Sequence, residues 1–311
     1  MERKIYFYTN EILRMLHGEY VNPVTCEIDL SNRCQLNCSF CMYKDYLAEN
    51  RCDLSLDIYK CLFRDFRQAG IESITFTGGG EPLMNNNAVE MIDMAFDQGF
   101  DMGLITNGIS LDHIPDDLLR GFKFIRVSLD APDGGIYEKI KGVDYFDKVL
   151  QNIVTTQEII GESTVLGLSY VVCEDNVWGI KSAKGLAKEL GVKYIQFKPA
   201  WINGDVFKYK TTSSNTVYSA SRCKAKTNFP CMIAGLVGVI GANGRVYYCC
   251  QHRGESRYEV GDLNDREFNE IWYDRSMIEP KIADCPMCRY MSYVKKFEEI
   301  PKMLIEHRRF L

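Results

Sequence analysis

The sequence predicts an α/β protein made of six strand–helix units followed by a smaller cysteine-rich extension. Strand-like and helix-like stretches alternate from Thr25 to about residue 200, which is typical of parallel βα units. Beyond that point the alternation stops, and cysteines gather around a predicted hairpin. We therefore expect an N-terminal lead-in at 1–24, a βα region at 25–200, and a linker plus extension at 201–311.

The elements are predicted from short apolar runs and from apolar residues at helical spacing. The predicted strands are 25–30, 73–77, 102–106, 124–129, 165–172 and 194–197. The predicted helices are 11–17, 87–98, 146–160 and 179–190. Six such units with right-handed crossovers can form an open barrel or a flat doubly wound sheet, and the pattern alone leaves both open.

The composition excludes several classes of partner. The chain has 311 residues, 46% hydrophobic and 25% charged, with a net charge of −5. It has no basic run for a nucleic-acid backbone, and its apolar stretches, such as 233–240, are shorter than a membrane span. No signal peptide is recognised at the N-terminus. The 13 cysteines therefore indicate a reducing compartment, the cytoplasm, and metal ligation rather than disulfides.

Three cysteines lie close together after the first predicted strand. Cys34, Cys38 and Cys41 have the spacing C-x3-C-x2-C, which a chance arrangement of 13 cysteines rarely produces. Thiolates favour zinc, cuprous copper or an iron–sulfur cluster. Three ligands are one short of a closed four-ligand site, so we expect one metal position to be open to another molecule.

This motif, the strand before it and the aromatic Phe40 resemble the radical S-adenosylmethionine (radical SAM) superfamily. The resemblance implies a partial (β/α)6 barrel. It also implies that Cys34, Cys38 and Cys41 hold a 4Fe-4S cluster whose open iron binds S-adenosylmethionine. Reductive cleavage of this cofactor would release a 5′-deoxyadenosyl radical that abstracts hydrogen from a substrate.

Polar motifs follow the next predicted strands, where the active site of parallel βα units lies. The turn after the second strand contains Gly79, Gly80 and Glu81, and resembles the family element that contacts the methionine ammonium group. Further residues at strand ends resemble positions that meet the ribose and carboxylate of the cofactor: Asn107, Ser128 and Asp130. Capping and turn formation are an equally good reading of these three. Lys198, on the sixth strand, could pair with a carboxylate or extend its amine to solvent.

The extension supplies a second set of thiols. Asn243-Gly244 between strand-like flanks predicts a β-hairpin, and the cysteines around it can form a complete four-thiolate site. Zinc is an open alternative for such a site. The segment resembles the SPASM/twitch extensions, which bind auxiliary 4Fe-4S clusters and here would end in a helix. The ligands that this resemblance implies are Cys231, Cys249, Cys285 and Cys288, with Cys249 chosen over the adjacent Cys250.

The other cysteines are given less specific roles. Cys223 lies outside both sets, and we expect a buried thiol, with hydrogen-atom donation to a substrate radical as the alternative. We expect Cys26, Cys52, Cys61 and Cys173 to lie in the core.

The resemblance implies a radical SAM enzyme with two 4Fe-4S clusters that abstracts hydrogen from an unactivated carbon. We favour a small polar metabolite, sugar- or nucleoside-like, and an oxidative outcome; a short peptide is the other substrate class. An epimerase, a decarboxylase or a ribosomal-peptide-modifying enzyme with Cys223 as hydrogen donor is the first alternative. A non-catalytic zinc-binding scaffold is the second. A reductant such as flavodoxin or ferredoxin is the expected protein partner.

Overall fold

A computed structural model describes residues 6–202, 205–207 and 231–274. Its centre is a parallel sheet of six strands that pair in sequence order. The strands are β1 (Thr25–Asp29), β2 (Ser73–Thr77), β3 (Asp101–Thr106), β4 (Phe122–Ser128), β5 (Val165–Val172) and β6 (Tyr194–Pro199). All six predicted strands are present, two of them with identical ends and the others with ends that differ by at most two residues.

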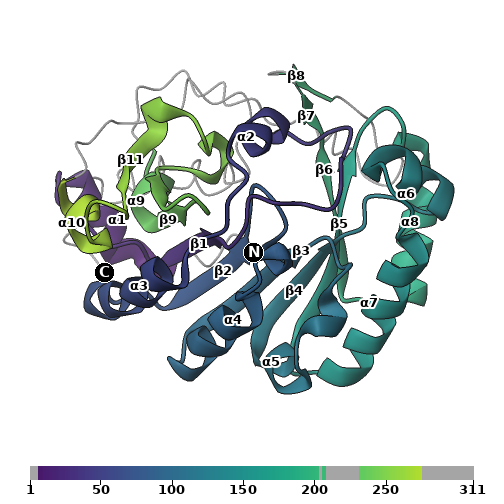
Figure 1. Cartoon of the computed structure of the whole chain (residues 1–311), viewed down its shortest axis with the longest axis horizontal. Helices are drawn as coiled ribbons and strands as arrows, with labels where there is room; N and C mark the ends of the chain where they lie inside the picture. Colours follow the sequence, from purple (N-terminus) through teal and green to yellow (C-terminus); the bar gives the residue numbers. More distant parts are fainter. Residues whose placement is uncertain (1–5, 203–204, 208–230, 275–311) are drawn as a thin grey trace, which may run out of the picture.

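Helices connect these strands and cover the outer side of the sheet (Figure 1). The helices are α3 (Leu56–Ala69), α4 (Ala88–Asp97), α5 (Asp116–Gly121), α6 (Gly134–Lys141), α7 (Phe146–Ile160) and α8 (Ile180–Glu189). The two ends of α3 illustrate how particular residues determine where a helix begins and ends. The Ser55 hydroxyl accepts a hydrogen bond from Ile58 N–H at its start, and Gly70 takes the left-handed conformation just past its end.

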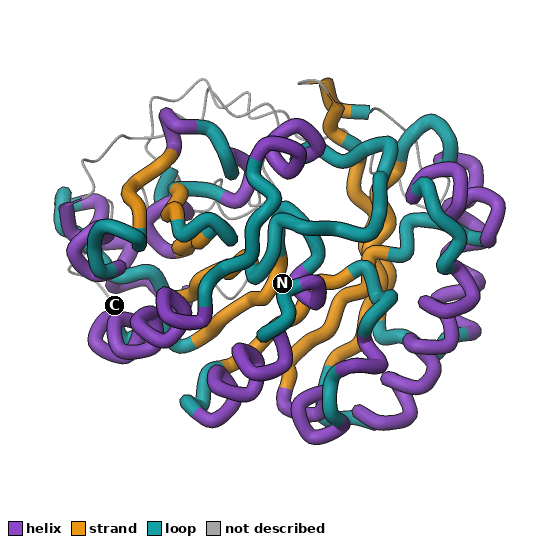
Figure 2. Tube along the Cα trace, viewed as in Figure 1, coloured by secondary structure: helices purple, strands orange, loops and turns teal. Residues whose placement is uncertain are grey.

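The smaller elements lie outside this βα repeat. They are α1 (Thr9–Leu16), α2 (Lys44–Glu49), β7 (Trp201–Ile202) and β8 (Asp205–Val206). Figure 2 shows loops crossing the inner side of the sheet, opposite the helices. Among the residues that the structure describes, no helix is long and apolar enough to cross a membrane.

The extension continues the same sheet. It contains α9 (Ile233–Leu236), β9 (Val237–Ile240), β10 (Arg245–Tyr247), β11 (Glu259–Asp262) and α10 (Phe268–Asp274). The predicted hairpin is confirmed: β9 and β10 are antiparallel, and Gly244 in the turn between them has φ 83°. Strand β9 pairs in parallel with β1, from Thr25 opposite Val237 to Ile28 opposite Ile240. Within the described ranges, the result is one open nine-stranded sheet with β11 and β6 at its edges, consistent with a partial barrel.

The extension also shares the hydrophobic core of the βα region. Phe268 and Trp272 of α10 are buried, and the Phe268 ring packs edge-on against Phe66 of α3 with 5.2 Å between centroids. The indole N–H of Trp272 donates to the Val21 carbonyl at 2.9 Å. Because these contacts join residues more than 200 positions apart, the extension is part of the main packing unit rather than a separate appendage.

The inner face of the sheet is polar above an aromatic floor. A Cβ on Gly103 would lie 2.3 Å from the Phe124 ring, and one on Gly167 would lie 2.3 Å from the Tyr194 ring. Each of these rings covers a glycine on the neighbouring strand. Only glycine is tolerated there, because a larger side chain would clash with the ring. The register places Arg126, Ser128 and their strand neighbours above this floor, toward the carboxyl ends of the strands. We call this polar inner side of the sheet the lumen.

The four cysteines predicted to be core residues differ in burial. Cys26 and Cys173 are buried and Cys52 is half-buried. Cys61 is exposed, so the prediction for this residue is wrong. It lies on the outward side of α3, whose inward side is formed by Leu62, Phe63 and other buried residues.

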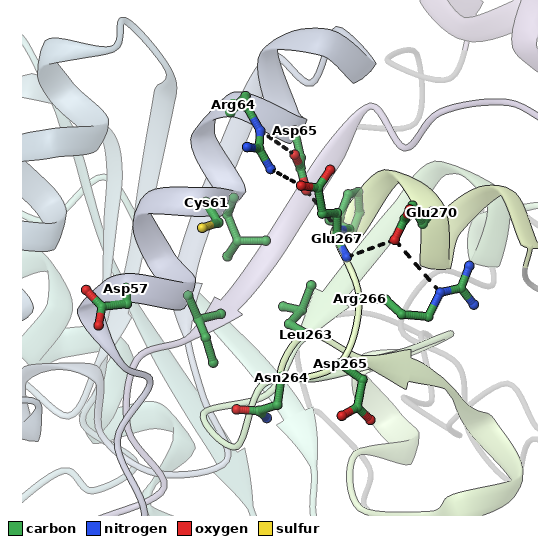
Figure 3. Close-up of a pocket in the computed structure, with 13 residues that line it drawn as sticks. Asp57, Cys61, Arg64, Asp65, Leu263, Asn264, Asp265, Arg266, Glu267 and Glu270 are labelled. Carbon is green, nitrogen blue, oxygen red and sulfur yellow. Dashed lines mark hydrogen bonds and ion pairs between the residues drawn. The ribbon is translucent and has the colours of Figure 1, made fainter.

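Cys61 lines a surface pocket of about 500 Å³ between α3 and the loop before α10 (Figure 3). In the close-up, Arg64 reaches toward both Asp65 and Glu267, and Arg266 toward Glu270. The Phe268 N–H donates to the Asp65 carboxylate at 2.8 Å. These contacts fasten the extension to α3 on the outer surface, away from the lumen.

Candidate active site

The three-cysteine motif forms a loop after β1 that curls against the end of α6. The N–H groups of Asn37 and Ser39 donate to the carbonyls of Lys141 and Ile140, at 2.9 and 2.8 Å. The Cys41 N–H donates to the Cys38 carbonyl at 3.1 Å, which forms a tight turn between these two cysteines. The C-terminal end of α6, about 100 residues later in the chain, therefore holds the motif in place.

The thiols of this loop are half-buried and lie near one another. Burial raises the pKa of all three, to about 12 for Cys34, whose pKa is raised further by Cys38 and Cys41. The Lys141 ammonium opposes this rise at Cys38 and Cys41. Within the described ranges, no three His, Cys, Asp or Glu side chains already have the geometry of a metal site. Because thiolate is the ligand form, Lys141 favours the ionisation that a cluster requires.

Lys141 forms a buried ion pair with Asp130 and organises three predicted site residues. The side chains of Lys141 and Asp130 are 2% and 1% exposed. The ammonium group also donates to the Ser128 carbonyl at 3.0 Å and lies 5.5 Å from the centre of the Phe40 ring. Burial alone would lower the pKa of Lys141, but Asp130 and Cys38 raise it, so the lysine is charged.

Sequence reasoning missed Lys141. It is one of several lysines, at the end of a short helix, and nothing in the pattern places that helix end beside Phe40.

Asp130 has a positive φ of 61°, unusual for a residue other than glycine. Its Oδ1 accepts a hydrogen bond from Val171 N–H at 2.6 Å, which holds this conformation.

The glycine-rich turn after β2 lies directly against the cysteine loop. The Glu81 N–H donates to the Arg33 carbonyl at 2.8 Å. A Cβ on Gly80 would lie 2.4 Å from this same carbonyl oxygen, so only glycine permits the contact. The Gly79 N–H donates to Asp29 Oδ2 at 3.2 Å. The two motifs that the sequence predicts to act together are therefore in backbone contact.

Glu81 is an internal anchor between the loops that follow β2 and β3. Its oxygens accept hydrogen bonds from the Thr106 hydroxyl at 2.6 Å and the Asn107 N–H at 2.7 Å. Burial raises the pKa of Glu81 to about 7, although these hydrogen bonds and one from Leu83 N–H lower it. The carboxylate oxygens are thus largely engaged by the protein, and the backbone around Gly79 and Gly80 is the part of this element left to meet a ligand.

Several buried polar atoms beside these loops have no hydrogen-bond partner among the described residues. Three of them are Asn107 Nδ2, Asn32 Oδ1 and Asp29 Oδ1. The first is a donor and the other two are acceptors, which suits the hydroxyl groups and the ammonium group of S-adenosylmethionine. With three thiols on the adjoining loop, the donor set fits a 4Fe-4S cluster and this cofactor.

Two thiols of the extension, Cys249 and Cys250, follow strand β10. Cys249 is half-buried and accepts a hydrogen bond from Gln251 N–H at 3.5 Å, whereas Cys250 is buried against Val239 and Tyr247. Hydrogen bonding from Cys250 lowers the pKa of Cys249 despite its burial. Both observations support Cys249 over Cys250 as the ligand. Cys231 is half-buried just before α9, while Cys223, Cys285 and Cys288 lie outside the described residues.

Arg253 joins the extension to the cysteine loop, and sequence reasoning missed it as well. It is buried, and it pairs with Asp29 at 2.7 Å and with Glu27 at 3.0 Å. Its Nη1 donates to the Tyr43 hydroxyl at 3.1 Å and to the Cys250 carbonyl at 2.7 Å. The same guanidinium thus touches β1, the chain just after Cys41, and the turn that carries Cys249.

Two family profiles match the chain. The one described as the Radical SAM superfamily matches residues 28–181, and the one described as an iron–sulfur cluster-binding domain, SPASM, matches residues 231–291. The first contains the three-cysteine loop, and the second contains all four predicted ligands of the extension.

Similar proteins include enzymes named GTP 3′,8-cyclase. The protein of Clostridium acetobutylicum is 27% identical over 246 residues, which cover 75% of this chain and 74% of that protein. A probable GTP 3′,8-cyclase of Pyrococcus abyssi is 32% identical over 141 residues, or 45% of each chain.

Solved structures with a similar fold include peptide-bound and cofactor-bound proteins. Streptococcus suis SuiB has a TM-score of 0.63 at 16% identity, over 88% of this chain and 70% of that chain. Native anSMEcpe with bound AdoMet has a TM-score of 0.58 at 16% identity, over 88% of each chain. At these identities the likeness establishes the fold.

Proposed function

Because the chain belongs to the radical SAM superfamily and carries an iron–sulfur cluster-binding extension, we propose that it abstracts hydrogen from an unactivated carbon of a small polar substrate bound in the lumen. The observation that carries this proposal is the contact between the cysteine loop and the glycine-rich turn at the carboxyl ends of β1 and β2. Active sites of parallel βα units lie at this end of the sheet.

The protein uses S-adenosylmethionine and two 4Fe-4S clusters, which when bound supply reductive cleavage of the cofactor and hydrogen-atom abstraction. In the proposed site, Cys34, Cys38 and Cys41 hold the first cluster. The backbone of Gly79 and Gly80 would approach the methionine end of the cofactor, and Asn107 Nδ2, which has no hydrogen-bond partner among the described residues, would donate to a ribose hydroxyl. The Lys141–Asp130 pair keeps Phe40 and Ser128 in position beside them.

The proposed ligands of the second cluster are Cys231, Cys249, Cys285 and Cys288. A complete four-thiolate site offers no open iron, so electron transfer is the role it supports. Arg253 links the turn of Cys249 to the end of the cysteine loop through Tyr43. This electron-transfer role supports an oxidative outcome, in which the substrate radical would lose an electron to the second cluster and release a proton.

We infer a sugar- or nucleoside-like substrate. The GTP 3′,8-cyclases among the relatives and the polar lumen support it. Short peptides are the second substrate class, because a SuiB structure contains the precursor peptide SuiA. A protein reductant such as flavodoxin or ferredoxin would supply the electron. The 13 cysteines favour a reducing compartment, the cytoplasm.

The test is S-adenosylmethionine cleavage by the anaerobically reconstituted protein, with dithionite as reductant. We expect a brown protein that forms 5′-deoxyadenosine, and no cleavage when Cys34, Cys38 and Cys41 are all replaced by Ala. Cys61→Ala is the matched control, because this thiol is exposed on α3 and we expect full cleavage.

Cleavage that persists in the triple variant would refute the site. A colourless zinc protein with no cleavage would favour the zinc-binding scaffold instead.

A further inference from the structure

The hydroxyl of Tyr137 is a buried hydrogen-bond donor without an acceptor in the described part of the chain. Tyr137 lies on α6 and is 0% exposed, and its hydroxyl has no hydrogen-bond partner among the described residues. Other buried tyrosines of this fold do have one. The Tyr59 hydroxyl donates to the Met91 carbonyl at 2.6 Å. The Tyr170 hydroxyl donates to the Asn176 carbonyl at 2.9 Å. Because burying a polar group without a partner costs free energy, the Tyr137 hydroxyl indicates an acceptor that binds beside it.

Helix geometry brings this side chain to the cysteine loop. Tyr137 and Lys141 are four residues apart, so they share one face of α6. The Lys141 ammonium lies 6.0 Å from the centre of the Tyr137 ring and 5.5 Å from that of Phe40, which belongs to the cysteine loop. The Tyr137 ring also packs against Phe146 of α7, with 5.7 Å between centroids. The ring is therefore fixed by contacts with α7 and with the ammonium group beside the cysteine loop.

The thiols of the loop act on this hydroxyl electrostatically. The pKa of Tyr137 is raised to about 12, chiefly by burial, and Lys141 opposes this rise. Cys38, Asp130 and Cys34 raise the pKa further, and Cys38 is the strongest of the three. The hydroxyl therefore lies within electrostatic reach of two sulfurs that the first cluster would use.

The charged side chains beside Tyr137 do not supply the acceptor. The Lys141 ammonium group can only donate. Each Asp130 oxygen already accepts a hydrogen bond, Oδ2 from Lys141 and Oδ1 from Val171 N–H. Sulfurs bound to iron are anionic acceptors, and a 4Fe-4S cluster adds sulfides to the three cysteine sulfurs. Such sulfurs are the acceptors that suit this hydroxyl.

We propose that the Tyr137 hydroxyl donates a hydrogen bond to a sulfur of the first 4Fe-4S cluster and thereby raises the reduction potential of that cluster. This rests on the proposed function, because it assumes that Cys34, Cys38 and Cys41 hold the cluster. Reduction adds negative charge to the sulfurs, so a hydrogen bond to them stabilises the reduced cluster more than the oxidised one. Tyr137 thus makes the cluster easier to reduce.

The experiment is a redox titration of the reconstituted protein, monitored by electron paramagnetic resonance. The first cluster is recognised by the change of its signal when S-adenosylmethionine is added, because only this cluster has an open iron. Tyr137→Phe removes the hydroxyl and keeps the ring. We expect it to lower the equilibrium constant for reduction of the first cluster roughly tenfold, which is about 59 mV for a one-electron couple. The potential of the second cluster should stay unchanged.

Tyr170→Phe is the matched control. It also removes a buried hydroxyl, but one that donates to a backbone carbonyl, so we expect an unchanged potential and unfolding at a lower urea concentration. A ring-fluorinated tyrosine at position 137 is the second variant. Fluorine makes the hydroxyl a stronger donor, so the potential should rise above that of the wild type. This variant tests the proposal even if Tyr137→Phe does not load iron.

The proposal is refuted if Tyr137→Phe has the wild-type potential, as it would if the hydroxyl donated to a water molecule. The same potential together with weaker S-adenosylmethionine binding would show that the hydroxyl serves that cofactor instead. An equal shift in Tyr170→Phe would also refute the proposal, since the loss of any buried hydroxyl would then be sufficient.

The redox titration requires no turnover, whereas the proposed function is tested by S-adenosylmethionine cleavage. Cleavage by the wild type, with equal potentials in the wild type and Tyr137→Phe, would refute this inference alone. A shifted potential in a protein that does not cleave the cofactor would refute the function alone.

Discussion

Arg253 Nε lies 2.7 Å from Asp29 Oδ2, so a cation of the C-terminal extension is neutralised by a carboxylate on the first strand of the barrel. Glu27, two residues earlier on the same strand, contacts the same guanidinium at 3.0 Å. All three side chains are less than 10% exposed. One buried arginine therefore contacts two buried carboxylates and offsets part of the cost of removing them from water.

Replacing Arg253 by Met should destabilise the protein by about 3–5 kcal/mol, because it removes the cation that contacts two buried carboxylates. Urea unfolding monitored by circular dichroism measures this. Arg245→Met is the control: Arg245 pairs with Glu259 at the surface, and its loss should cost less than about 1 kcal/mol. Equal losses of unfolding free energy in the two variants would show that the buried cluster contributes no more to stability than a surface ion pair.

Gly80→Ala should displace the glycine-rich turn from the cysteine loop, because its Cβ would lie 2.4 Å from the Arg33 carbonyl oxygen. Overpacking of this kind costs about 1–3 kcal/mol. We also expect weaker S-adenosylmethionine binding, measured by equilibrium dialysis. Gly185→Ala on α8 meets no atom within 4 Å and should stabilise the helix by about 0.5–1 kcal/mol. Normal cofactor binding by Gly80→Ala would contradict the proposed contact.

Glu81 should make the stability of the protein fall as pH rises from about 4.5 to about 7. Its pKa is raised from the ordinary 4.5 to about 7, so in this window the folded state holds a proton that the unfolded state has lost. The difference amounts to about 3 kcal/mol, fully lost above pH 7. Urea unfolding at pH 5 and pH 7.5, without added S-adenosylmethionine, should show this fall in the wild type and a smaller one in Glu81→Gln. The same fall in both would mean that another group causes it.

Anaerobic reconstitution should give about eight iron atoms per chain, as expected for two 4Fe-4S clusters. The variant without Cys34, Cys38 and Cys41 should retain about four, since the thiols of the extension are intact. Iron and zinc are measured together by elemental analysis. About four iron atoms in the wild type, with zinc present, would show that the extension holds zinc.

Cys223→Ala should leave the product unchanged if the substrate radical is oxidised, because no thiol hydrogen is then needed. Turnover in deuterated water followed by mass spectrometry of the product is the measurement, since exchangeable thiols carry deuterium. A native product with one carbon-bound deuterium, together with stalling of the variant, would make Cys223 the hydrogen donor and the outcome an epimerisation.

The sequence predicts what depends on local spacing. The six strands follow from apolar runs at regular intervals, and the cysteine loop and the glycine-rich turn follow from motifs in which all residues are adjacent. The hairpin at Asn243-Gly244 is equally local.

The sequence does not predict relations that depend on distant packing. Lys141 faces Phe40 only because α6 ends beside the cysteine loop, and Arg253 meets Glu27 across 226 positions. A buried charge has no distinct pattern in a sequence, because its environment is created by other segments. The exposed Cys61 shows the same limit: a cysteine inside an amphipathic helix is compatible with either side of that helix.

The parallel pairing of β9 with β1 bears on how the chain folds during its synthesis. The first strand of the barrel leaves the ribosome early, but the strand that covers its free edge lies more than 200 residues later. Until residue 240 has emerged, β1 has an unpaired backbone edge that could pair with another chain. We therefore expect nascent chains that end before β9 to aggregate or to depend on chaperones, and the barrel to reach its native state only after the extension has been synthesised.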